Sequence, residues 1–220
     1  MTGARVITSA VAGVPTRAST RSPPATSSRR WNDGLWRVAD VAAWLVRRRA
    51  RLAEALVRRR VALGFVAAIV ALVLARPTWS TWRTGLIVAV AGEAIRIWAA
   101  GHLEKSREVT RSGPYRWTRH PLYAGSALIA LGIVIAARSA VVAVVAALYI
   151  GLTIPAAIRA EEGFLRRAFG DTYDRYREAR SEPMARAFSV ERALRNREYR
   201  AAAGLIAGFA LLAMKVLLSI

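Results

Sequence analysis

Residues 122–158 read LYAGSALIALGIVIAARSAVVAVVAALYIGLTIPAAI, which is two apolar runs separated only by Arg138 and Ser139. An α-helix rises about 1.5 Å per residue, so roughly 20 apolar residues cross the hydrocarbon core of a bilayer. The runs Leu122–Ala137 and Ala140–Ile158 approach that length. They predict two membrane helices joined by a very tight turn.

Three more apolar runs lie elsewhere in the chain, at Val61–Ala75, Thr84–Gly101 and Ala201–Ile220. The shorter runs can still span a bilayer because flanking arginines, such as Arg60 and Arg76, snorkel to the headgroups. Buried helices of a soluble protein are the alternative, which the run lengths disfavour. We therefore predict an all-α fold, a polytopic membrane helical bundle of about five transmembrane helices. The predicted spans are 61–79, 84–101, 121–137, 140–158 and 201–220.

The composition excludes several classes of protein and site. The 220-residue chain suits one domain, is 55% hydrophobic, and carries 34 basic against 14 acidic residues, for a net charge of +20. It contains no cysteine and two histidines, so we expect no disulfide scaffold, no thiol nucleophile and no metal site. The basic residues flank the apolar runs, which favours contact with anionic membrane lipid over nucleic acid. We expect no nucleic-acid partner.

The distribution of Lys and Arg predicts the topology. These residues number 13 in 1–60, two in Arg76–Arg83, five in His102–Arg119, one at Arg138 and 11 in Arg159–Arg200. Connections rich in Lys and Arg stay in the cytoplasm. The rule places the N-terminus and both rich connections inside, the C-terminus outside, and the protein in the cell's inner or plasma membrane. Five crossings give that parity.

The N-terminal part has two sections. Residues 1–30 are rich in Ser, Thr, Ala, Pro and Arg without a periodic apolar face, which is typical of a disordered tail. They lack the apolar core of a secretory signal. Residues 31–60 place apolar side chains such as Val38 and Leu45 at near-helical spacing among arginines, which predicts an amphipathic interfacial helix. A solvated basic linker is the alternative. The membrane-embedded domain is then 61–220.

Two charged residues interrupt the second apolar run. Glu93 and Arg96 are three residues apart, on neighbouring positions of one helical face. Each is costly in lipid, so both should face the interior of the bundle, where they can pair. An ion pair that only locks the helices and a polar wall for a substrate cavity are both compatible with this pattern.

The densest cluster of reactive and polar residue types is 112–125, SGPYRWTRHPLYAG. Pro121 suits the first turn of a helix, whose free N–H groups favour an anionic ligand. Arg119 could clamp a carboxylate or phosphate, and the rings of Tyr115 and Tyr123 could face a cation. An interfacial belt of aromatic residues and arginine is the alternative for each residue taken singly.

A pair of acids, Glu161 and Glu162, follows the fourth run, in which Pro155 should produce a kink. The pair could merely neutralise neighbouring arginines. It also lies at the same predicted membrane depth as His120, so it could meet the loop that carries Arg119. Carboxylates there would accept hydrogen bonds from sugar hydroxyls or balance a bound cation.

Residues 113–125 strongly resemble the motif of the isoprenylcysteine carboxyl methyltransferase family, and phospholipid N-methyltransferases share a related pattern. The matching residues are Gly113-Pro114-Tyr115-Arg116-x-x-Arg119-His120-Pro121-x-Tyr123-x-Gly125. Residues 96–103 resemble the stretch that precedes this motif in bacterial members. Residues 161–176 resemble the family's C-terminal signature through Glu161-Glu162-x-x-Leu165-x-x-x-Phe169-Gly170-x-x-Tyr173-x-x-Tyr176. The resemblance covers roughly 92–178, and the span at 201–220 departs from the family's usual ending.

The resemblance implies a membrane enzyme that uses S-adenosylmethionine as cofactor, in a pocket open to the cytoplasm with a lateral gap for a lipophilic substrate. By motif position, the implied cofactor contacts are Val109, Tyr115, Arg119, His120, Pro121, Leu122, Tyr123 and Glu161. The implied catalytic residues are Glu161, Glu162 and Arg119. Arg96 and Arg159 are the implied substrate contacts, although Arg159 does not match its family position residue for residue.

The leading hypothesis is methyl transfer from S-adenosylmethionine to a lipophilic small-molecule or lipidated acceptor in the membrane. A carboxylate acceptor needs no base, whereas an amine needs one, for which the Glu pair are the candidates. The sequence leaves both acceptors open, as it does the oligomeric state. An NADPH-dependent membrane reductase is one alternative, because sterol reductases resemble this architecture. A non-catalytic polybasic protein that binds anionic lipid is another.

Overall fold

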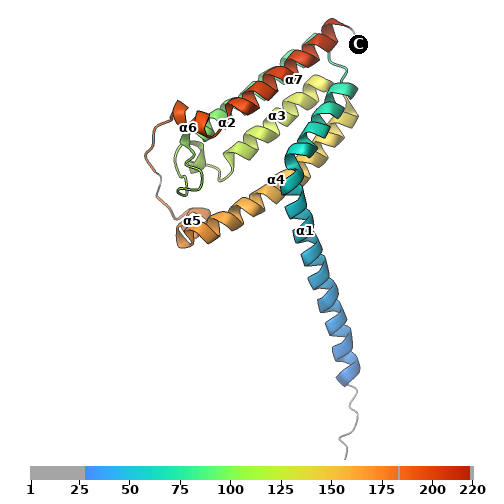
Figure 1. Ribbon diagram of the computed structural model, residues 1–220, viewed down its shortest axis with the longest axis vertical. Helices are drawn as coiled ribbons and strands as arrows, with labels where there is room; N and C mark the ends of the chain where they lie inside the picture. Colours follow the sequence, from blue (N-terminus) through green and yellow to red (C-terminus); the bar gives the residue numbers. More distant parts are fainter. Residues whose placement is uncertain (1–27, 183, 219–220) are drawn as a thin grey trace, which may run out of the picture. The chain divides into compact units, whose positions relative to one another are not determined.

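The computed structural model describes residues 28–182 and 184–218, and these form helices and connecting loops without a strand (Figure 1). The helices are α1 (Ser28–Leu74), α2 (Trp79–His102), the 3-10 helix η1 (Gly113–Arg116), α3 (Pro121–Ala137), α4 (Ala140–Phe169), α5 (Asp171–Arg177), α6 (Val190–Arg195) and α7 (Tyr199–Leu217). The chain divides into two compact units, 1–45 and 46–220. The helix contacts and the site described below belong to the second. The predicted disordered tail lies outside the described residues up to residue 27, and 28–30 are already helical.

The α2–α3 pair is the tightest packing contact between helices, because small residues face each other along it. A Cβ added to Gly92 would lie 2.7 Å from the backbone oxygen of Gly125, and one added to Gly132 would lie 2.7 Å from the Cβ of Ala89. Such a surface lets two backbones approach closely, as is common between membrane helices. Together with α7, this pair forms one side of the bundle (Figure 1).

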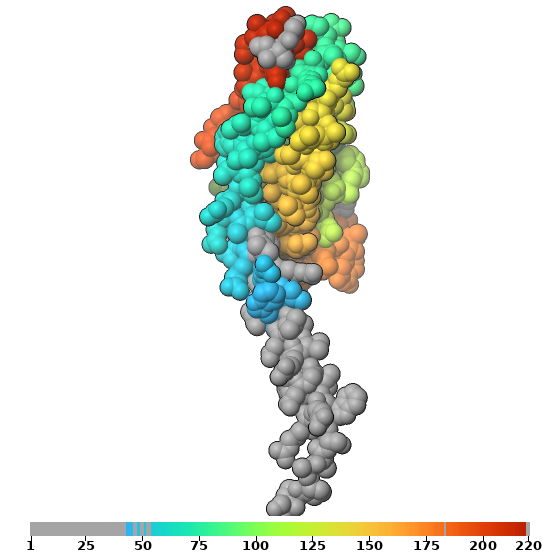
Figure 2. Space-filling model, turned by 90° about the vertical axis from the view of Figure 1, so that its right-hand side faces the viewer, coloured from blue at the N-terminus to red at the C-terminus, as the bar shows by residue number. Residues whose placement is uncertain are grey.

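The other side is formed by α4 and the C-terminal part of α1, which lie side by side in both views (Figure 2). The hydroxyl of Tyr149 in α4 donates a hydrogen bond to the backbone oxygen of Arg60 in α1, at 3.2 Å. The same phenol packs at Gly64 of α1. These contacts fix α4, which carries the acidic pair, within the bundle.

One end of the bundle holds the two tight turns and the end of α7. The N–H of Arg76 donates to the oxygen of Ala137 at 2.8 Å, and the ammonium of Lys215 donates to three backbone oxygens at the end of α1, at 2.9–3.1 Å. Arg138 has φ 49°, which lets the chain turn from α3 directly into α4. The predicted turn at 138–139 is confirmed.

The helices around the first connection begin and end several residues away from the first two predicted spans. The first span was predicted to reach residue 79 and the second to begin at 84, but α1 ends at Leu74 and α2 begins at Trp79. Pro77 interrupts the helix, and the Thr78 hydroxyl accepts from the N–H of Thr81 in a capping box. Helix initiation therefore occurs before the apolar run.

Among the described residues, α2, α4 and α7 are long and apolar enough to cross a membrane, and α3 is apolar but shorter. The first predicted span, 61–79, corresponds to the C-terminal part of α1, which ends at Leu74 and also contains the predicted interfacial segment 31–60. Likewise α4 extends beyond the predicted end at 158 to Phe169, with Pro155 inside it. The acidic pair therefore lies on a helix that continues past the apolar run.

Candidate functional site

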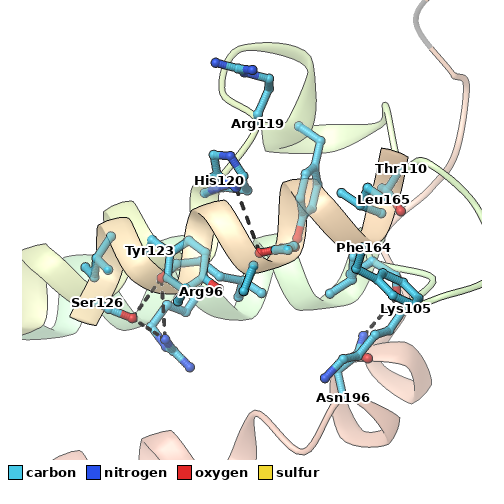
Figure 3. A pocket seen from close by; sticks show the side chains of 18 of the residues that line it. Arg96, Lys105, Thr110, Arg119, His120, Tyr123, Ser126, Phe164, Leu165 and Asn196 are labelled. Atoms are coloured by element: carbon cyan, nitrogen blue, oxygen red, sulfur yellow. Dashed lines mark hydrogen bonds and ion pairs between the residues drawn. The ribbon is translucent and has the colours of Figure 1, made fainter. Parts of the chain in front are cut away.

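A cavity of about 630 Å³ lies at the end of the bundle opposite the 138–139 turn. Its wall combines segments that are distant in sequence. It is lined by parts of α1, the end of α2, the connection 103–120, the first turns of α3, one face of α4, α5 and residues 196–198 (Figure 3). This volume is typical of small-molecule sites, which range over about 300–1,000 Å³.

His120 directs its ring toward α4 (Figure 3), where its two ring nitrogens approach the acidic pair. It precedes Pro121, the first residue of α3, and its side chain makes no capping bond to the helix. Its Nε2 lies 3.3 Å from Oε1 of Glu162, and its Nδ1 lies 4.0 Å from Oε2 of Glu161. The predicted convergence of the loop with the acidic pair is confirmed. The Nδ1 atom is buried without a hydrogen-bond partner among the described residues.

The two acids have different surroundings. Oε1 of Glu162 also accepts a hydrogen bond from Arg119, at 3.2 Å, so this carboxylate joins the loop to α4 from outside the cavity lining. Glu161 lines the cavity, with 42% of its side chain exposed. Glu162 therefore holds the connection that carries Arg119 against α4, whereas Glu161, which interacts with Tyr123, presents its carboxylate to the cavity.

Arg96 is the centre of a second polar cluster in the cavity. Its guanidinium lies 2.5 Å from Glu198 and 3.5 Å from Glu93. It also donates to the hydroxyl of Ser126, at 2.5 Å (Figure 3). The predicted Glu93–Arg96 pair is present, but the closer carboxylate belongs to Glu198, on the segment that enters α7. Two carboxylates therefore share one guanidinium within the bundle, where each charge requires a partner.

Tyrosines of η1 and α5 close the side of the cavity next to the connection 113–120. The hydroxyl of Tyr176 donates to the backbone oxygen of Tyr115 at 2.8 Å. Burial, then the neighbouring Tyr173, raises the pKa of Tyr176 to about 12. Burial, then the Glu162 carboxylate, raises the pKa of Tyr173 to about 12, and burial raises that of Tyr115 further. All three phenols are neutral at physiological pH.

Most of the predicted site residues line this one cavity. Those that do are Arg96, Val109, Tyr115, Arg119, His120, Pro121, Leu122, Tyr123 and Glu161. Glu162 lies behind the lining, in contact with Arg119 and His120. Arg159 is exposed and is not part of the lining, so the structure does not bring it to the other residues.

Several lining residues were not predicted. Ser126 is three residues after Tyr123 on α3, so helical spacing could have indicated it. No such signal exists for Asn196 and Glu198, because their position in the lining depends on the path of the chain after α5. The amide of Asn196 donates to the backbone oxygens of Ala100 and Leu103, both at 2.9 Å, which holds this returning segment against the end of α2.

Comparison with known protein families identifies the family of this chain. The family model described as phospholipid methyltransferase matches residues 59–172, just over half of the chain. The chain belongs to the phospholipid methyltransferase family. The matched region includes His120, Glu161 and Glu162, whereas Asn196 and Glu198 lie beyond it. With its three helices of spanning length, this member of the family is an integral membrane protein.

The comparison also found two curated relatives of this member of the phospholipid methyltransferase family. The cobalt-zinc-cadmium resistance protein CzcN of Cupriavidus metallidurans is 34% identical over 119 residues, which cover 50% of this chain and 54% of the relative. The nickel-cobalt-cadmium resistance protein NccN of Alcaligenes xylosoxydans xylosoxydans is 31% identical over 115 residues, which cover 48% and 54%. The matches thus span about half the length of each relative. No solved structure matches the chain significantly.

Proposed function

We propose that this protein is a membrane methyltransferase that transfers a methyl group from S-adenosylmethionine to a lipophilic acceptor in the bilayer. One observation carries the proposal: His120 and Glu161, which lie 41 residues apart on the two motif stretches, line the same cavity of about 630 Å³. Membership of the phospholipid methyltransferase family supports the reaction type.

The residues of the cavity fit S-adenosylmethionine chemically. Nδ1 of His120 is a buried polar atom that lacks a partner among the described residues, and the carboxylate of Glu161 is available in the lining. Carboxylates accept hydrogen bonds from hydroxyls and balance positive charge. The faces of Tyr115 and Tyr123 suit a cation, since aromatic rings attract onium groups. These four residues would hold the cofactor.

When bound, S-adenosylmethionine would supply a methyl group on a positively charged sulfur, and this sulfur would leave as a neutral thioether when an acceptor nucleophile takes the methyl group. The residues of this chain would align the acceptor with that methyl group and exclude water, since such a transfer depends mainly on closeness, about 3–3.5 Å, and orientation. The apolar surfaces of Ile154 and Phe164 on α4 line the same cavity. They provide a wall for a lipophilic acceptor.

The surroundings of Arg96 favour an amine over a carboxylate as acceptor. The guanidinium already contacts Glu198, Glu93 and Ser126, so little of it is left to bind an acceptor carboxylate. An amine must lose a proton before or during attack. The carboxylate of Glu161, in the lining, is the group that would accept it.

The cavity would open to the cytoplasm. The connections at its end of the bundle carry five and 11 basic residues, in 102–119 and 159–200, whereas the opposite end has four, Arg76, Arg83, Arg138 and Lys215. The positive-inside rule therefore supports a cytoplasmic N-terminus and site, with the end of α7 outside.

The test is transfer of labelled methyl from S-adenosylmethionine to total lipid in membranes that contain the protein, followed by mass analysis of the labelled product. We expect labelled lipid with the unmodified protein and a loss of at least about 100-fold in Glu161→Gln, the usual scale for removing a general base. Glu191→Gln is the matched control, because that side chain is 85% exposed on α6 and outside the cavity. Absence of labelled lipid with folded protein would overturn the proposal.

NADPH-dependent reduction and a purely lipid-binding role are the two alternatives, and the same membranes distinguish them. A reductase would consume NADPH without transferring label. A non-catalytic protein would do neither, and Glu161→Gln would then behave like the unmodified protein.

A further inference from the structure

A second cavity, of about 740 Å³, adjoins the first across Tyr115, Arg119 and Tyr176, which line both. It lies between the connection 115–119 and the segment 176–182. We refer to it as the arginine groove. It shares a wall with the proposed methyl-transfer cavity but has its own set of side chains.

The arginine groove is strongly basic. Five of its 12 lining residues are arginines, and the lining contains one acid, Glu182. The arginines are Arg111, Arg116, Arg119, Arg177 and Arg180. So many like charges around one hollow repel each other, and an anion in it would relieve that repulsion.

Only part of this charge is neutralised within the protein. Arg119 pairs with Glu162, and Arg180 pairs with Glu178. In the part of the chain that the structure describes, the other three arginines of the groove have no carboxylate within 4.0 Å, and Nε of Arg111 is buried without a hydrogen-bond partner. Guanidinium groups that have no carboxylate partner are suited to form two parallel hydrogen bonds with phosphate oxygens.

Tryptophans place the groove at the membrane surface. Trp117 lines it and is 76% exposed, and its ring lies 5.4 Å from that of Trp98, in the penultimate turn of the membrane-spanning helix α2. Exposed tryptophans at the ends of membrane helices lie at the level of the lipid headgroups. The groove is therefore at the depth where headgroup phosphates occur.

We propose that the arginine groove binds the phosphate of an anionic phospholipid of the surrounding membrane, with Arg116 and Arg177 as its main contacts. The hydroxyls of Thr118 and Ser181, also in the lining, would donate further hydrogen bonds. This site lies outside the methyl-transfer cavity and does not depend on the reaction proposed for it. Phosphate is the chemistry recognised, and the lipid headgroup is the source that the position of Trp117 favours.

The experiment uses the full chain in neutral detergent, titrated with phosphatidylglycerol and followed by native mass spectrometry, which counts bound lipids. We compare the unmodified protein with Arg116→Gln/Arg177→Gln. The matched control is Arg83→Gln/Arg175→Gln, which removes the same charge from exposed residues that line neither cavity. Arg175 lies on the same short helix, α5, as Arg177.

We expect the groove variant to bind phosphatidylglycerol at least about tenfold more weakly, the loss expected for one charge-assisted bond, and the control variant to bind it unchanged. Arg116→Lys/Arg177→Lys should restore binding in part, since lysine keeps the positive charge but lacks the planar guanidinium that can donate two hydrogen bonds to one phosphate. An equal loss in both Gln variants would show a dependence on net charge alone and overturn the proposal. Displacement of the lipid by millimolar inorganic phosphate would contradict the lipid assignment and indicate a site for soluble phosphate. Unchanged helical content by circular dichroism shows that the variants are folded.

Discussion

Glu161 and Glu162 show how adjacent residues acquire different tasks. Successive side chains on a helix point about 100° apart, so one faces the cavity while the other meets Arg119 and His120. The motif predicts both acids as functional. It does not predict the division between them, which depends on the rotation of α4 against the start of α3.

At the residue scale, Glu162→Gln should destabilise the fold. It removes the negative charge that both Arg119 and His120 contact. Hydrogen bonds to a charged group contribute about 1.5–3 kcal/mol to stability, and the partial exposure of this pair to solvent places the contribution at the lower end of that range. We expect a loss of about 1–2 kcal/mol in denaturant unfolding. Glu161→Gln serves as the control, because its carboxylate has no bond closer than 4.0 Å to His120. Equal losses in the two variants would contradict the division of tasks.

Tyr176 predicts a dependence of stability on alkaline pH. Its pKa is raised in the folded state to about 12, so its hydroxyl contributes fully below pH 10 and the contribution disappears as the pH rises through 12. Tyr176→Phe removes the bond to the oxygen of Tyr115, which should cost about 1 kcal/mol at pH 8. The difference between the two proteins, measured by thermal unfolding, should shrink between pH 10 and 12. A constant difference would be inconsistent with this role.

At the scale of elements, apolar runs predict most of the helices because lipid demands long uncharged segments. The start of α2 and the continuity of α1 are not predicted, since they depend on the Thr78 cap and on arginines that a helix accommodates readily. The short helix α6 lies in the basic segment, where hydropathy carries no signal. The role of Glu198 is not predicted either, because it depends on how that segment packs back against α2.

The packing of α2 on α3 predicts opposite results for two glycines. Gly132→Ala places a Cβ within 2.7 Å of Ala89, so the helices must separate, at about 1–3 kcal/mol. Gly151→Ala on α4 has nothing within 4 Å and should be neutral or stabilising by up to about 1 kcal/mol. The unfolding free energy of both variants, measured in detergent against the unmodified protein, tests these expectations. A harmless Gly132→Ala would contradict close contact of the two backbones.

At the scale of the whole molecule, the basic connections and the cavity lie at one end of the bundle, and the tight turns and the end of α7 lie at the other (Figure 1). The sequence predicts this arrangement through alternating charge, because each crossing reverses the side. It does not predict the depth of the cavity, which arises from the tilt and spacing of helices.

The proposed orientation is testable because the chain has no cysteine. Single substitutions Ser80→Cys, in the first turn of α2, and Thr172→Cys, in α5, place a thiol on exposed residues of elements at opposite ends of the bundle. A membrane-impermeant thiol reagent should label Ser80→Cys in intact cells, and Thr172→Cys only after permeabilisation. The reverse pattern would place the cavity outside the cytoplasm.

The central claim is that the 113–125 and 161–176 stretches together hold the methyl donor, and calorimetric titration of the purified protein with S-adenosylmethionine tests it most directly. Binding should be measurable in the unmodified protein and weaker by at least about tenfold in Glu161→Gln and in His120→Ala, with Glu191→Gln unchanged. No heat of binding in folded protein, or equal binding in all four proteins, would contradict the claim.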